Sequence, residues 1–256
     1  MDMGIAGSTA VVTGGTSGIG LATAVALARE GCRVAVCGRT ESTLRDATRD
    51  VAQVGEEQPL GIQADVRDSG SVARLFEQVT RELGGVDILV NCAGAAVPAP
   101  YTEMTDQRWL DAFDYKFLGY VRCCMQALPL MRARGGGSIV NVAGTAAKEP
   151  NPWTTSSGAV NAALLNCTKT MSRSFASSSI RVNAVSPGPT ATERWTTLAS
   201  LEPERAAQIE ANMPLGRLVA PEEVADAVMF LASPRAAGVN GTTLVVDGGR
   251  MVSVAA

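Results

Sequence analysis

The sequence predicts one α/β domain in which a parallel sheet is covered by helices on both faces. Two observations support this. Short apolar runs alternate with runs of helical length along nearly the whole chain, and the first apolar run ends in a glycine-rich turn that opens a helix-like run. The length of 256 residues favours one large domain over two, so we expect the domain to span residues 1–256.

The predicted strands are short and rich in Val, Ile, Leu and Ala. They are expected at residues 10–12, 34–37, 60–64, 86–90, 138–142, 180–185 and 243–246. The segments between the predicted strands have sequences typical of helices. Helices are expected at residues 21–30, 41–54, 71–83, 106–134, 156–176 and 222–231. In a sheet of this kind, ligands bind beyond the carboxyl ends of the strands.

Composition excludes several classes of function. The net charge is −3 and the chain has no Lys/Arg cluster, so we expect no nucleic-acid partner. No apolar run reaches membrane-spanning length, and residues 1–7 do not resemble a signal peptide. The six cysteines lack metal-ligand spacing and histidine is absent, so we expect reduced thiols, a cytoplasmic location and no metal site.

The glycine-rich turn has the spacing G-x-x-x-G-x-G, formed by Gly14, Gly18 and Gly20. Gly14 permits a tight turn, Gly18 lets backbone N–H groups approach a pyrophosphate, and Gly20 lets the helix pack closely on the strand. The phosphates would then meet the positive end of the helix. The alternative is a loop that needs glycine only for positive φ.

The second strand is followed by Gly38 and Arg39, where NAD-binding proteins of this kind carry an acid for the adenosine ribose. Gly38 offers no carboxylate, and Arg39 could instead pair with a 2′-phosphate. The alternative is a solvated loop arginine. We therefore favour NADP over NAD as cofactor.

These motifs resemble those of the short-chain dehydrogenases/reductases along nearly the whole chain. The family's motifs match Thr13-Gly14-(x)3-Gly18-Ile19-Gly20, Asp65-Val66, Asn91-Cys92-Ala93-Gly94, Arg181-Val182-Asn183, Pro187-Gly188, Asn240-Gly241 and Asp247-Gly248-Gly249. The resemblance implies a doubly wound Rossmann domain with a seven-stranded parallel sheet. It also implies a small-molecule substrate and a homotetramer or homodimer, paired through the helices that begin near Asp106 and Ser156.

The resemblance also implies a set of cofactor-binding residues. Asp65 and Val66 would contact adenine, and Thr192 would hold the nicotinamide carboxamide. The full set is Gly14, Thr16, Ser17, Gly18, Ile19, Gly20, Arg39, Asp65, Val66, Asn91, Ala93, Gly94, Asn161, Pro187, Gly188, Thr190 and Thr192.

The catalytic positions depart from the family pattern of Asn, Ser, Tyr and Lys. Ungapped counting from the neighbouring motifs places these four on Lys116, Gly144, Ser157 and Asn161. A serine hydroxyl is a far weaker acid than a phenol, and Ser157 is too short to reach the place that the tyrosine reaches. Gly144 has no hydroxyl at all. The usual proton relay is therefore disfavoured.

Lys116 and Asn161 look like an exchange of the family's asparagine and lysine. Because those two side chains lie close together in the family, Lys116 would direct its ammonium toward the place of the missing lysine, with Asn161 facing it. The alternative is that Lys116 extends to solvent. Neighbouring hydroxyls are more typical of local caps than of catalysts; they are Thr145, Thr154, Thr155 and Ser156.

Residues 189–216 correspond to the family's substrate-covering loop. Its apolar inner face is expected to contain Trp195, Leu198, Leu201, Met213 and Leu215. Such a face is consistent with an apolar ligand or simply with packing on the cleft. The sequence does not name the substrate.

Three functions remain open. The first is an atypical oxidoreductase acting on a small-to-medium apolar carbonyl, alcohol or enone with a rewired proton relay. The second is a non-redox enzyme, such as a cyclase, dehydratase or isomerase, in which the cofactor is structural. The third is a catalytically inactive cofactor-binding or regulatory protein. An absorbance change of the nicotinamide separates the first from the others.

Overall fold

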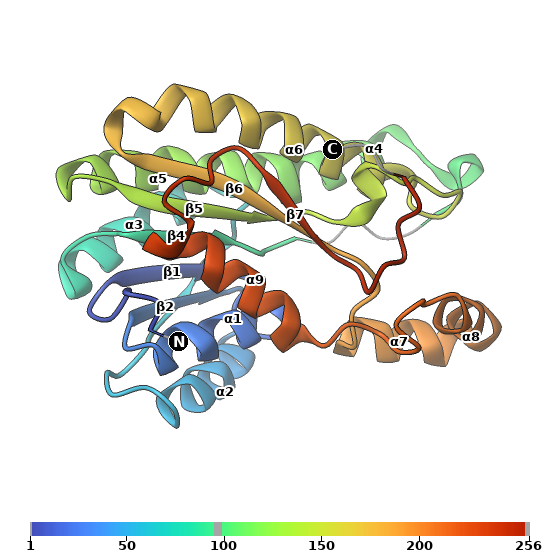
Figure 1. Cartoon of the computed structure of the whole chain (residues 1–256), viewed down its shortest axis with the longest axis horizontal. Coiled ribbons are helices and arrows are strands. Elements are labelled where there is room, and N and C mark those ends of the chain that lie inside the picture. The colour runs from blue at the N-terminus through green and yellow to red at the C-terminus, as the bar shows by residue number, and fades with distance from the viewer. Residues whose placement is uncertain (1, 95–98, 254–256) are drawn as a thin grey trace.

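A computed structural model describes residues 2–94 and 99–253 of the chain (Figure 1). Its centre is a seven-stranded sheet in the order β3-β2-β1-β4-β5-β6-β7, and every neighbouring pair is parallel. The strands are β1 (Thr9–Thr13), β2 (Arg33–Gly38), β3 (Leu60–Gln63), β4 (Ile88–Asn91), β5 (Gly137–Val142), β6 (Ile180–Pro187) and β7 (Thr243–Val246). The predicted fold class is confirmed.

Helices cover both faces of this sheet (Figure 1). One face carries α1 (Gly18–Arg29), α2 (Glu41–Ala52) and α9 (Pro221–Ala232). The other carries α3 (Ser69–Leu83), α5 (Gly119–Ala133) and α6 (Thr155–Phe175), with α4 (Asp106–Ala112) before α5. The strands are buried from both sides, which explains why they appear in the sequence as continuous apolar runs.

Each face has its own apolar core. Leu27 of α1, Val51 of α2 and Val228 of α9 pack in the first core and are fully buried. Leu75 of α3 and Met131 of α5 are equally buried in the second. Full burial of a side chain of this kind contributes about 1.5–3 kcal/mol, so the two cores fix the helices against the sheet.

The strand order reverses between β1 and β4. From β1 the chain proceeds outward to β2 and β3, and then returns to the other side of β1 to place β4. The connections after β1 and β4 therefore diverge at the carboxyl edge of the sheet. This reversal is where open α/β sheets form their ligand crevice.

The predicted continuous helix over residues 106–134 is wrong in one respect. Between α4 and α5, residues Phe113–Leu118 form a π-helical segment, labelled η2. The helix then continues through Pro129. A π-turn changes which side chains face the sheet, and such turns occur frequently at functional sites.

The predicted covering loop at residues 189–216 contains two helices, α7 (Glu193–Leu201) and α8 (Pro203–Ala211). They pack against each other, and Trp195 Nε1 donates a 2.9 Å hydrogen bond to Glu210 Oε1. Met213 is buried as expected. Leu201 and Leu215, however, are 75% and 49% exposed, so the expected apolar inner face is wrong for these two residues. Each lies where a helix or turn directs its side chain outward.

No helix in the described ranges is both long enough and apolar enough to cross a lipid bilayer.

Candidate cofactor and active site

The glycine-rich turn joins β1 to α1 at the point where the strand order reverses. Gly14 has φ +66°, and a Cβ there would lie 2.7 Å from Ala93 Cα. A Cβ on Gly20 would collide with the Gly14 carbonyl oxygen. Side chains are therefore excluded at Gly14 and Gly20 by contacts with backbone. This result agrees with the tight turn expected at Gly14 and the close helix–strand packing expected at Gly20.

The first turn of α1 presents its backbone N–H groups at this edge of the sheet. Ser17 precedes the helix in an extended conformation, and its side chain makes no capping hydrogen bond. The orphan N–H groups of a helix start attract anions, reinforced by the helix dipole.

A cavity of about 610 Å³ extends over the turn and the carboxyl ends of β1, β2 and β4. Small-molecule and cofactor sites span about 300–1,000 Å³. The predicted cofactor residues that line it are Gly14, Thr16, Ser17, Gly18, Ile19, Gly20, Arg39, Val66, Ala93, Gly94 and Thr192. The glycine-rich turn, the helix start and the cavity size together fit a dinucleotide.

The remaining predicted cofactor residues do not line this cavity; they are Asp65, Asn91, Asn161, Pro187, Gly188 and Thr190. Asn91 lies inside the sheet, where its Nδ2 donates to Asn141 Oδ1 at 3.0 Å. Thr190 Oγ1 donates to the Gly188 carbonyl at 3.0 Å. Thr192 lies against the turn, with its Cγ2 3.1 Å from the position of a Cβ on Gly18.

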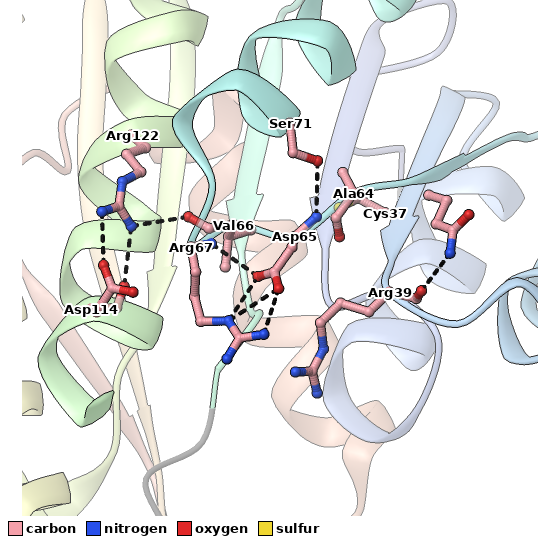
Figure 2. Close-up of polar contacts among 10 residues, drawn as sticks. Cys37, Arg39, Ala64, Asp65, Val66, Arg67, Ser71, Asp114 and Arg122 are labelled. Atoms are coloured by element: carbon pink, nitrogen blue, oxygen red, sulfur yellow. Dashed lines mark hydrogen bonds and ion pairs between the residues drawn. The ribbon is translucent and has the colours of Figure 1, made fainter. Parts of the chain in front are cut away.

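Arg39 and Asp65 lie at the ends of β2 and β3, on the side expected to hold adenosine (Figure 2). The guanidinium of Arg67 binds Asp65 with its Nε 3.0 Å and its Nη2 2.6 Å from Oδ2. This hydrogen bonding lowers the pKa of Asp65. The Asp65 backbone N–H donates to Ser71 Oγ at 3.1 Å, which fixes the loop after β3.

Lys116 belongs to the π-helical segment η2 and is buried, with 9% of its surface exposed. Its Nζ donates a 2.9 Å hydrogen bond to the carbonyl oxygen of Ala143, at the end of β5. The side chain therefore does not extend to solvent. Burial lowers the pKa of Lys116 to about 8, while Cys92 raises it and the charge of Arg194 lowers it further.

Asn161 and Gly144 meet beside this lysine. A Cβ on Gly144 would lie 2.8 Å from Asn161 Nδ2, and the Gly144 backbone is extended. Asn161 is 5% exposed, and its Oδ1 is buried without a hydrogen-bond partner. Lys116 and Asn161 thus converge on the Ala143–Gly144 peptide from two different helical segments. An unpartnered buried acceptor is energetically costly, and Asn161 is not among the residues that line the cavity.

Hydroxyls at the start of α6 are bound to nearby backbone. Ser157 Oγ lies 3.4 Å from the carbonyl of Thr154, one turn earlier. Thr155 Oγ1 donates to Ala99 O at 3.1 Å. The Ser157 contact is a local bond to the preceding turn, whereas the Thr155 contact ties the start of α6 to Ala99. Neither hydroxyl has a basic side chain as its hydrogen-bond partner.

The three tyrosines lie in different surroundings. Tyr120 is buried and donates from its hydroxyl to Val142 O at 2.9 Å. Tyr101 is 74% exposed. Tyr115 lines the cavity, with the Arg39 Cζ 5.0 Å from its ring centroid. The π-helical register that directs Tyr115 to the cavity is not visible in the sequence, since Phe113–Leu118 also fit a regular helix.

Other cavity residues were also missed. Glu193, Arg194 and Thr197 of α7 line the cavity beside Thr192. Their position depends on how α7 lies over the turn, for which the sequence carries no motif. Within residues 2–94 and 99–253, no cluster of three or more His, Cys, Asp or Glu side chains has the arrangement of a metal site.

Known proteins resemble this chain over nearly its full length. Residues 14–250 match the family model described as enoyl-(acyl carrier protein) reductase. The cis-4-hydroxycyclohexanecarboxylate dehydrogenase of Sinomonas cyclohexanicum is 40% identical over 241 residues, which cover 94% of this chain and 95% of that enzyme.

Solved structures have the same fold. L-sorbose reductase of Gluconobacter frateurii, in complex with NADPH and L-sorbose, superposes with a TM-score of 0.93 at 33% identity, covering 99% of this chain and 100% of that one. A structure described as a short-chain dehydrogenase/reductase family protein is 42% identical, with a TM-score of 0.86 and coverage of 97% and 98%. The family match and these likenesses, together with the glycine turn and sheet order, show that the chain belongs to the short-chain dehydrogenase/reductase family of oxidoreductases.

Proposed function

We propose that this protein is an NADP(H)-dependent oxidoreductase with a rewired proton relay. Its substrate would be a small-to-medium carbonyl compound, alcohol or enone. The proposal rests on the hydrogen bond from the buried Lys116 ammonium to the Ala143 carbonyl oxygen, beside Asn161 and Gly144. The family's four catalytic residue types are absent from the four positions that counting assigns to them.

The residues of the glycine turn and the start of α1 would bind the pyrophosphate, and Arg39 would bind the 2′-phosphate. Asn161 would bind a hydroxyl of the nicotinamide ribose. The nicotinamide, when bound, would supply or accept a hydride. Thr192, which lines the cavity, would bind the carboxamide.

Lys116 would then provide the cation of the site. One N–H of its ammonium is held by Ala143 O, which orients Nζ beside Gly144. Its pKa of about 8 places the loss of the proton close to neutral pH. A group with such a pKa holds and releases a proton at Nζ effectively. The space that the family's serine side chain would fill at Gly144 is taken by Asn161, whose Nδ2 lies 2.8 Å from the position of a Cβ there.

The test is absorbance at the nicotinamide band with NADPH and a panel of ketones, aldehydes and enones, and with NADP⁺ and the matching alcohols. We expect substrate-dependent oxidation or reduction of the cofactor. Product formation at constant absorbance would favour the non-redox alternative. Cofactor binding without turnover across the panel would favour the inactive, cofactor-binding alternative.

Replacing Arg39 with alanine is expected to weaken NADP⁺ binding by about 1–3 kcal/mol, the range of a charge-assisted hydrogen bond. NAD⁺ lacks the 2′-phosphate, so its affinity should change little. Calorimetry with both cofactors measures the difference. Equal losses for the two cofactors would contradict the assignment of Arg39, and no binding of either would contradict the cofactor proposal.

The proposal includes a homodimer or homotetramer formed through α4, α5 and α6. Leu110 of α4 and Met125 of α5 are 63% and 65% exposed. On α6, small residues such as Ala162 lie at the surface and would permit close approach. Light scattering at micromolar concentration is expected to give twice or four times the monomer mass, and a monomer would contradict this assignment.

All six cysteines are free thiols in the structure. This supports the reducing, cytoplasmic location that forms part of the proposal.

A further inference from the structure

Two guanidinium groups lie against the ring of Tyr115. The Cζ of Arg39 is 5.0 Å from the ring centroid, and that of Arg67 is 5.6 Å from it. Both distances lie within the range of cation–π attraction. Tyr115 is half-buried and comes from η2, whereas the two arginines follow β2 and β3.

The Arg39 guanidinium forms no ion pair within the described ranges. Its side chain is exposed, and its backbone is fixed by the 2.8 Å hydrogen bond from Gln63 Nε2 to Arg39 O. The ring of Tyr115 is thus the side chain that holds the guanidinium at the cavity. A free arginine side chain samples many rotamers, and part of that entropy is lost on binding an anion.

The nearby carboxylate that could compete for the Arg39 guanidinium, Asp65, is already bound by Arg67. Arg67 donates to both carboxylate oxygens of Asp65, at 3.1 Å to Oδ1 and 2.6 Å to Oδ2. Figure 2 shows Arg67 beside this carboxylate while the Arg39 guanidinium extends past it. Arg39 is therefore available to an incoming anion. The ring of Tyr115 keeps the Arg39 guanidinium near the cavity, which both residues line.

We infer that Tyr115 is a positioning residue for the adenosine 2′-phosphate, acting through Arg39. The inference rests on the proposed NADP(H) function and adds a residue to it. The ring orders the guanidinium before the phosphate arrives, so less side-chain entropy is lost on binding. The next residue of the same π-helical segment, Lys116, donates its hydrogen bond to Ala143 O, so neighbouring residues of η2 would serve the two proposed roles.

The test uses calorimetry with 2′,5′-ADP and 5′-AMP, two probes that lack the nicotinamide. Tyr115→Leu is expected to weaken 2′,5′-ADP binding about two- to fivefold more than 5′-AMP binding, the factor of an exposed cation–π contact. Tyr115→Phe keeps the ring and should bind both probes as the wild type does. In the Arg39→Ala background, Tyr115→Leu should cause no further selective loss, because the two residues act as one unit.

Three outcomes would overturn the inference. An unchanged affinity ratio in Tyr115→Leu excludes a role for the ring, even if Arg39→Ala shows the expected selective loss. An additive effect in the double variant shows that Tyr115 acts independently of Arg39. Failure of the wild type to bind 2′,5′-ADP overturns the NADP(H) proposal as well. Tyr115→Met serves in the same scheme if thermal melting shows that Tyr115→Leu does not fold.

Discussion

Replacing Lys116 with methionine is expected to lower kcat/KM by about a hundredfold or more, because a positioned acid–base group or its activator contributes at least that factor. Methionine keeps most of the aliphatic stem, and the stem is buried against Gly94, where a Cβ would lie 3.1 Å from Lys116 Cβ. The fold should therefore persist, which thermal melting checks. Steady-state turnover of the nicotinamide gives the rate.

The pH profile separates a charged lysine from a merely structural one. Burial lowers the pKa of Lys116 to about 8, so the ammonium loses its proton as the pH rises through that value. A reaction that needs the cation should lose kcat/KM above about pH 8 and retain it below. The descending limb should be absent from Lys116→Met. If kcat/KM instead rises as the pH passes 8, the neutral amine of Lys116 is the form that the reaction needs.

Ser157→Ala is the matched control for this prediction. The Ser157 hydroxyl is short and lies 3.4 Å from the Thr154 carbonyl, so its removal should change activity by no more than severalfold. Strong reductase activity that disappears in Ser157→Ala but survives in Lys116→Met would reverse the assigned roles.

Restoring the family's four residues together is expected to raise reductase activity on a simple ketone by about a hundredfold or more. The variant combines Lys116→Asn, Gly144→Ser, Ser157→Tyr and Asn161→Lys. It tests whether the cofactor already lies in the family's pose. The rate of NADPH oxidation with the ketone is compared with that of the wild type and of each single variant.

The single changes should achieve little, because these groups act as a unit. Gly144→Ser alone would place a Cβ 2.8 Å from Asn161 Nδ2, although the extended backbone at Gly144 accepts a serine. Asn161→Lys alone would bring a second ammonium to the peptide that already binds Lys116. A folded quadruple variant that binds NADPH but gains no activity would contradict the shared pose.

The sheet could be predicted because each strand is a short apolar run buried on both faces. The predicted bounds of β7 match the structure to the residue, and those of the other strands differ by one or two residues at an end. The π-helical segment at Phe113–Leu118 could not be predicted, since its residues also fit a regular helix. Its register depends on the packing of η2 against Gly94 and α6.

The part of the site that depends on close backbone contacts could be predicted from the sequence. Gly14 and Gly20 lie where any side chain would contact backbone, so their spacing alone indicates the turn. The place of Lys116 could be inferred only through the resemblance to the family. The position of Tyr115 could not be predicted, because its contact with Arg39 joins residues 76 positions apart in the sequence, one in η2 and one after β2.

The most direct test of the rewired relay is a crystal structure of the NADP⁺ complex at high resolution. The account predicts that Lys116 Nζ keeps its hydrogen bond to Ala143 O and also lies within hydrogen-bonding distance of the nicotinamide ribose or of the substrate oxygen. Asn161 should face the same ribose. A complex in which Lys116 contacts neither group, or in which Tyr115 or Tyr120 stands against the nicotinamide ring, would contradict it.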